Sequence, residues 1–158
     1  MKRLMVVALA AVLAACASND EVELKPADLV DFNESADIRE IWSDNVGVGA
    51  GKDYNLLPPA SLTDRVFAAD AEGLVIAYNR SSGDEQWQVE LGAEISSGVG
   101  AAGGQGFVGT LRGKVIALDA DTGSVQWESS VTGEVLAPPQ SNGSEVAVQT
   151  LDGKVFGL

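Results

Sequence analysis

A repeat of forty residues constrains this chain more than any other feature. Gly73, Gly113 and Gly153 stand forty residues apart, and Trp87 returns as Trp127 at the same interval. Between them, short segments rich in β-branched and aromatic residues alternate with glycine-containing turns, as strands and hairpins do. A period near 40 residues is typical of a propeller blade, a sheet that must stack on similar sheets to bury its faces. The repeat therefore predicts an all-β fold, a β-propeller of four-stranded antiparallel blades.

The expected strands follow from the register of the repeat. Two-residue turns that end in glycine join the central strands of each unit, because glycine tolerates positive φ. The predicted ring is incomplete, with roughly two full blades plus partial ones. We expect strands over 65–70, 74–79 and 86–90 in one unit, over 106–111, 114–119 and 125–130 in the next, and near the start of later units over 95–101 and 135–140.

Each full unit also carries a turn that is followed by a tryptophan, and this pairing predicts how blades meet. A small alanine allows close approach of two sheets, while Asp or Asn with Ser or Thr closes the turn and glycine takes its strained corner. The large indole then lies across the neighbouring blade and needs an acceptor for its N–H. We expect these residues to dock one blade on the next: Ala77, Gly83, Trp87, Ala117, Asp119, Thr122, Gly123 and Trp127.

The N-terminus has the pattern of a targeting segment. Lys2 and Arg3 precede an apolar run over 4–15, which ends in small residues before Cys16. The run would cover about 18 Å as a helix, well short of a ~30 Å hydrocarbon core, so it is typical of a signal peptide. Its end resembles the bacterial lipobox, in which the cysteine becomes the lipid-modified first residue. The alternative is an ordinary secretory signal with an incidental Cys16. In lipoprotein sorting, Ala17 after the cysteine implies the outer membrane.

Charge limits the partners of the chain. The formal net charge of −13 becomes more negative once the signal peptide is removed with its two cations. Such a surface repels nucleic acid and anionic lipid headgroups, so membrane contact is expected through the lipid alone. The predicted domains are a signal peptide over 1–15, a lipidated N-terminus and tether over 16–37, and a partial propeller over 38–158.

Patterns that suggest chemistry are better explained by the β repeat. The chain has no histidine and one cysteine, which excludes histidine-based triads and metal sites. Residues 119–123 resemble a calcium loop only faintly, since the glycine and the final acid are misplaced. Residues 98–103 match G-x-G-x-x-G, but a glycine turn and a strand follow instead of the required helix. Asp84 and Glu85 are expected to be solvated carboxylates. We therefore expect no catalytic residue, cofactor or metal.

The turn pattern Ala-x-Asp-x-x-Thr-Gly-x-x-x-Trp resembles the tryptophan-docking motif of pyrroloquinoline-quinone-type propellers. The order along the chain narrows the resemblance: a lipobox, Ile41-Trp42-Ser43, Pro58-Pro59, and then the tryptophan repeats. This order resembles the BamB family, lipoprotein subunits of the machine that inserts β-barrels into the outer membrane.

The resemblance implies a non-enzymatic scaffold, anchored by lipid in the outer membrane and facing the periplasm. Its implied partners are the periplasmic domains of the barrel-forming subunit, but no partner-binding residue of this chain can be carried over. Two alternatives stay open: a quinoprotein-type dehydrogenase, and a periplasmic propeller lipoprotein of another complex. Because the family closes a ring of about eight blades, we expect this chain to be an N-terminal fragment.

Overall fold

The computed structural model describes residues 26–31, 33, 35–52 and 55–158. The chain divides into two units, 1–38 and 39–158, which are considered separately. In the first unit the described residues form neither helix nor strand. The predicted signal peptide and Cys16 lie outside the described residues. No helix of membrane-spanning length and hydropathy occurs in the part of the chain that the structure describes.

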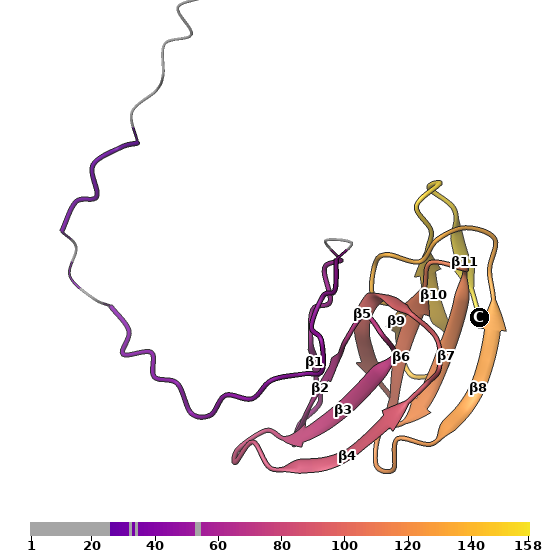
Figure 1. Cartoon of the computed structure of the whole chain (residues 1–158), viewed down its shortest axis with the longest axis horizontal. Helices are drawn as coiled ribbons and strands as arrows, with labels where there is room; N and C mark the ends of the chain where they lie inside the picture. The colour runs from indigo at the N-terminus through magenta and orange to yellow at the C-terminus, as the bar shows by residue number, and fades with distance from the viewer. Residues whose placement is uncertain (1–25, 32, 34, 53–54) are drawn as a thin grey trace, which may run out of the picture. The chain divides into compact units, whose positions relative to one another are not determined.

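The second unit consists of antiparallel sheets in chain order (Figure 1). The first blade contains β1 (Ala60–Ser61), β2 (Arg65–Ala69), β3 (Leu74–Asn79) and β4 (Glu85–Glu90). The second contains β5 (Ile95–Ala102), β6 (Gln105–Thr110), β7 (Lys114–Asp119) and β8 (Val125–Ser130). The third contains β9 (Gln140–Ser141), β10 (Val146–Gln149) and β11 (Val155–Gly157). The prediction of an all-β propeller with four-stranded blades and an incomplete ring is confirmed.

The first two blades share one register. Ala77 pairs with Trp87 across β3 and β4, and Ala117 pairs with Trp127 across β7 and β8. In both pairs the register shifts immediately after the alanine, which marks a β-bulge. A bulge increases local twist and re-aims the side chains beside it. The same β-bulge therefore sets the direction of both indoles.

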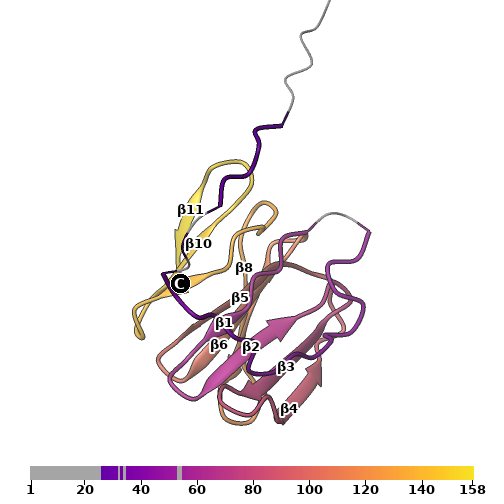
Figure 2. The same cartoon turned by 90° about the vertical axis from the view of Figure 1, so that its left-hand side faces the viewer.

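The hydrophobic core lies between the sheets. Strands β3 and β7 are buried on both faces over their central residues, whereas the outer strands β4 and β8 alternate between exposed and half-buried residues. One cluster joins the first and second blades around Phe67 and Ile116, and another joins the second and third around Phe107 and Val148. Figures 1 and 2 show the sheets stacked side by side. Each blade thus buries its faces against its neighbours, as the repeat requires.

One predicted strand is mostly irregular. The sequence predicts a strand over 135–140, but β9 begins only at Gln140. Pro138 and Pro139 lack the N–H groups that a ladder requires, so pairing begins after them. The same cause explains why β1 starts after Pro58-Pro59 and has two residues.

Candidate functional site

Trp87 extends from the outer strand of the first blade onto the turn of the second. Its Nε1 donates a hydrogen bond to the carbonyl oxygen of Ala120 over 3.0 Å. A Cβ placed on Gly123 would lie 2.5 Å from Cε3 of the indole, so only glycine leaves room for the ring. The ring also packs on Phe67, with centroids 5.9 Å apart. The structure therefore brings Trp87 and Gly123 together across the blade junction.

The turn that receives the indole is held by its own side chains. Oδ1 of Asp119 accepts hydrogen bonds from the Asp121 and Thr122 N–H groups and from the Thr122 hydroxyl. The Thr122 hydroxyl and N–H in particular lower the pKa of Asp119 below its ordinary value. Gly123 has φ +73 and donates to the Asp119 carbonyl at 2.9 Å. The turn is thus organised independently of the indole that lies on it.

The equivalent turn of the first blade is built in the same way and also receives an indole. Oδ1 of Asn79 accepts hydrogen bonds from the next N–H groups, and Gly83 has φ +78. Trp42 supplies the indole: its Nε1 donates to the Arg80 carbonyl over 2.9 Å, and a Cβ on Gly83 would lie 2.7 Å from the ring. Trp42 also packs on Tyr78, with centroids 5.5 Å apart.

Sequence reasoning did not assign this docking contact to Trp42. The residue precedes Trp87 by forty-five positions instead of forty, and a glycine-rich segment follows it. The available indication was that Trp42 stands one blade before the Gly83 turn, as Trp87 stands before the Gly123 turn. Trp127, by contrast, packs against Phe107 with centroids 6.0 Å apart and contributes to the core between the second and third blades.

Arg65 makes a second contact between the first two blades, which the sequence also did not indicate. Its guanidinium donates to the Ala120 carbonyl over 3.1 Å and forms an ion pair with Asp121. The Ala120 carbonyl therefore accepts from both Arg65 and Trp87. One backbone oxygen of the second blade anchors two side chains of the first.

The glycine string 98–103 serves close backbone packing. Gly98 faces Pro58, and the Val99 N–H donates to the Pro58 carbonyl over 3.1 Å. A Cβ on Gly100 would lie only 1.9 Å from the Pro139 carbonyl oxygen. Because these glycines lack a Cβ, the backbone of this segment lies close to the proline pairs of the two adjacent blades. Strand β5 covers residues 98–102 of this string, which therefore lies within the β repeat.

A buried carboxylate fixes the segment 46–52, which we call the strap, to the first blade. Asp70 is 3% exposed and accepts hydrogen bonds from four backbone N–H groups. Three belong to its own hairpin, residues 72–74, and the fourth belongs to Val48 of the strap at 3.0 Å. The Ala71 N–H also donates to the Gly49 carbonyl at 2.9 Å. Asp70 therefore links the strap to the β2–β3 hairpin.

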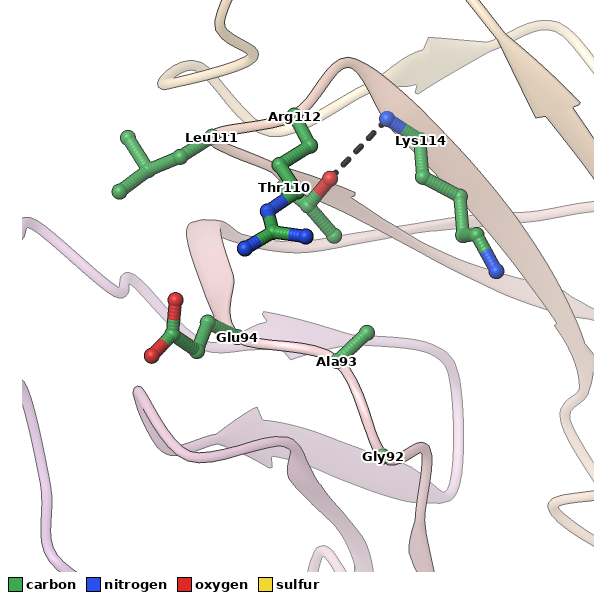
Figure 3. Close-up of a pocket in the computed structure, with 7 residues that line it drawn as sticks. All are labelled: Gly92, Ala93, Glu94, Thr110, Leu111, Arg112 and Lys114. Carbon is green, nitrogen blue, oxygen red and sulfur yellow. Dashed lines mark hydrogen bonds between the residues drawn. The ribbon is translucent and has the colours of Figure 1, made fainter.

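A cleft of about 370 Å³ lies at the same end of the second blade (Figure 3). One side is the linker between β4 and β5, and the other is the β6–β7 hairpin with Arg112 and Lys114. The described residues include no group of three or more Cys, Asp or Glu side chains placed to hold a metal ion.

A family model described as outer membrane protein assembly factor BamB matches residues 36–158. The chain belongs to the BamB family. The BamB of Pseudomonas aeruginosa is 46% identical over 111 residues, which cover 70% of this chain and 29% of that relative. The chain therefore spans about three tenths of the length of that BamB.

Two solved structures resemble this chain, and the first of them is a BamB. The crystal structure of BamB from Moraxella catarrhalis has a TM-score of 0.60 and 38% identity, covering 65% of this chain and 31% of that one. A europium-containing methanol dehydrogenase has a TM-score of 0.53 and 20% identity, covering 63% of this chain and 22% of that one. At that identity the second likeness shows the propeller fold alone.

The docking geometry yields a prediction for Gly123. Replacing Gly123 by alanine places a methyl group where the indole lies and strains a backbone at positive φ. We expect a loss of about 2 kcal/mol in the free energy of unfolding, measured by urea denaturation. Gly104 is the control, since it also has positive φ but its Cβ would meet nothing within 4 Å. Equal losses from Gly104→Ala and Gly123→Ala would show that the indole adds nothing to the backbone strain.

Proposed function

We propose that this chain is part of a lipid-anchored, non-enzymatic scaffold that assists the insertion of β-barrel proteins into the outer membrane. The scaffold is held by Cys16 in the outer membrane, faces the periplasm, and binds the periplasmic domains of the barrel-forming subunit. The observation that carries this proposal is the BamB family match over 36–158, in a family named for outer membrane protein assembly.

The described residues support binding rather than chemistry. The docking residues serve contacts between blades, and the glycine string packs on proline pairs instead of opening toward a ligand. The net charge of −13 favours a protein partner over nucleic acid. Because this chain covers 29% of the Pseudomonas relative, much of the partner surface is expected on sequence that this chain does not include.

Affinity purification of the full lipidated protein from detergent-solubilised outer membranes tests the proposal. We expect the barrel-forming subunit to be recovered and identified by mass spectrometry. Recovery of a different periplasmic complex would contradict the assignment. Quinone absorbance together with alcohol-dependent dye reduction would instead establish a dehydrogenase.

A secreted variant without Cys16 separates anchoring from folding. In this variant residues 1–16 are replaced by an ordinary cleavable secretory signal, so that neither the lipid nor the apolar run stays on the protein. We expect it to appear in the soluble periplasmic fraction with an unchanged circular dichroism spectrum, because the lipid alone holds the protein at the membrane. Membrane retention of the secreted variant would show that the lipid is dispensable for anchoring.

A further inference from the structure

The second and third blades differ where the linker from the preceding blade meets the β-hairpin. In the third blade the linker and the hairpin are joined directly, because the Leu151 N–H donates a hydrogen bond to the Glu134 carbonyl over 2.9 Å. The residues forty positions earlier are Leu111 and Glu94, and the structure gives them no such bond. Leu111 and Glu94 instead line the cleft of Figure 3. The second blade thus exposes a backbone donor and a backbone acceptor that the third blade pairs.

One substitution within the repeat accompanies the difference. Gly133 in the closing linker has φ +116, and its Cβ position lies 3.0 Å from Cβ of Thr150. The residue forty positions earlier is Ala93, and a residue with a Cβ rarely adopts such a φ. The neighbouring Gly92 faces open space, since its Cβ would meet nothing within 4 Å. The two linkers therefore differ at the position where the linker of the third blade meets its hairpin.

The tips of the two hairpins also differ in charge. Asp152 in the third blade accepts a hydrogen bond from Thr150 and forms an ion pair with Lys154. Its counterpart is Arg112, whose guanidinium has no hydrogen bond or ion pair among the described residues. Figure 3 shows Arg112 and Glu94 on opposite sides of the gap. A free cation on a chain of net charge −13 attracts a carboxylate from another molecule.

A second cleft, of about 510 Å³, shares Glu94 and Leu111 with the first and continues to the strap. Val48 and Lys52 line it, and Val48 is 52% exposed. Leu111 is 38% exposed between the two clefts. The two clefts together form one groove. Its apolar side chains include Leu111 and Val48, and its charged side chains are Lys52, Glu72, Glu94, Arg112 and Lys114.

We propose that this groove binds an extended acidic segment of a partner protein. An extended backbone supplies a carbonyl for the Leu111 N–H and an N–H for the Glu94 carbonyl, as in strand addition to a sheet edge. An apolar side chain of the segment packs on Leu111 and Val48, and its carboxylate pairs with Arg112. This inference goes beyond the proposed function, because it assigns a site and a ligand chemistry without reference to barrel assembly.

NMR titration of the full chain with two capped peptides tests the site. The acidic probe is acetyl-Val-Glu-Val-Glu-Val-amide, and the matched basic probe has lysine in place of glutamate. We expect the acidic probe to shift the Leu111 amide while leaving the Leu151 amide, which is already paired, unchanged. Equal shifts for both probes, equal shifts at Leu111 and Leu151, or no shift at all would overturn the proposal.

Variants of the hairpin separate the charge contribution from the backbone contribution. Arg112→Asp introduces the residue that the third blade has at the equivalent position, Asp152. It should weaken the binding of the acidic probe about tenfold or more, as expected for the loss of a charge-assisted hydrogen bond. Leu111→Pro removes the N–H at a turn position that suits proline, and it should weaken binding more than Leu111→Ala does. Arg80→Ala removes an exposed cation elsewhere and should change nothing. An Arg112→Asp variant that binds as tightly as the parent would refute the charge contact.

Discussion

Replacing Trp87 by alanine is expected to lower the free energy of unfolding by about 3 kcal/mol. The substitution removes the packing of the indole on Phe67 and the Gly123 turn, together with its hydrogen bond to the Ala120 carbonyl. The estimate is at the lower end for tryptophan truncation because the side chain is only half-buried. Urea denaturation followed by tryptophan fluorescence and circular dichroism measures the change.

Two controls show which part of Trp87 matters. Trp87→Phe keeps an aromatic ring and loses the N–H, so we expect about 1 kcal/mol of destabilisation from the hydrogen bond. Gln88→Ala alters the exposed neighbour on the same strand and should stay within about 0.5 kcal/mol of the parent. If Trp87→Ala were no more destabilising than Gln88→Ala, the indole would not hold the two blades together.

Replacing Asp70 by alanine is expected to have a comparable effect, also about 3 kcal/mol at neutral pH. Four backbone N–H groups lose a charged acceptor, and one of them is buried. Each such bond contributes about 1.5–3 kcal/mol when taken singly, but the half-buried groups regain part of this from water. Hydrogen exchange at Val48 and Ala71 should accelerate together, because both amides hold the strap.

The effect of Asp70 depends on pH in a defined direction. Burial alone would raise the pKa of Asp70, but the four N–H donors lower it below its ordinary value of 3.8. The carboxylate therefore stabilises the fold at every pH above about 4, and this contribution is lost as the pH falls through the lowered pKa. The difference between the parent and Asp70→Ala in urea should be full at pH 7 and should shrink in more acidic buffer.

Asp70→Thr is the matched control, because Thr110 and Thr150 occupy the equivalent positions of the later blades. Thr110 accepts from the Lys114 N–H at 3.0 Å, so threonine is able to support a hairpin. We expect this variant to release Val48 while keeping most of the stability. A loss as large as that of Asp70→Ala would show that the hairpin, and not the strap, needs the carboxylate.

The sequence predicted the parts of the fold that repeat. The forty-residue period located the hairpins at Gly73 and Gly113, because turns and alternating strands leave a local pattern. The strand predicted over 135–140 was wrong for most of its length, because Pro138 and Pro139 have no N–H to donate to a neighbouring strand. The proline pair is visible in the sequence, but the repeat alone does not show its effect on strand pairing.

Contacts between different repeats were harder to predict. A period shows which positions correspond, but it does not show what each position touches in the next sheet. Gly100 has no local feature that indicates its approach to the Pro139 carbonyl, and Trp42 lies outside the forty-residue spacing. At the groove, Ala93 stands where the next repeat has Gly133, a departure from the repeat that does not by itself reveal a groove.

Both placed indoles reach forward along the chain: Trp42 rests on the Gly83 turn, and Trp87 rests on the Gly123 turn. The proposed exported protein enters the periplasm N-terminus first, so the receptor for an indole arrives after the indole itself. Each new repeat covers the open flank of the one that precedes it, so exposed apolar surface stays confined to the most recent blade. The direction of export and the direction of assembly coincide, which limits the surface available for aggregation while the chain enters the periplasm.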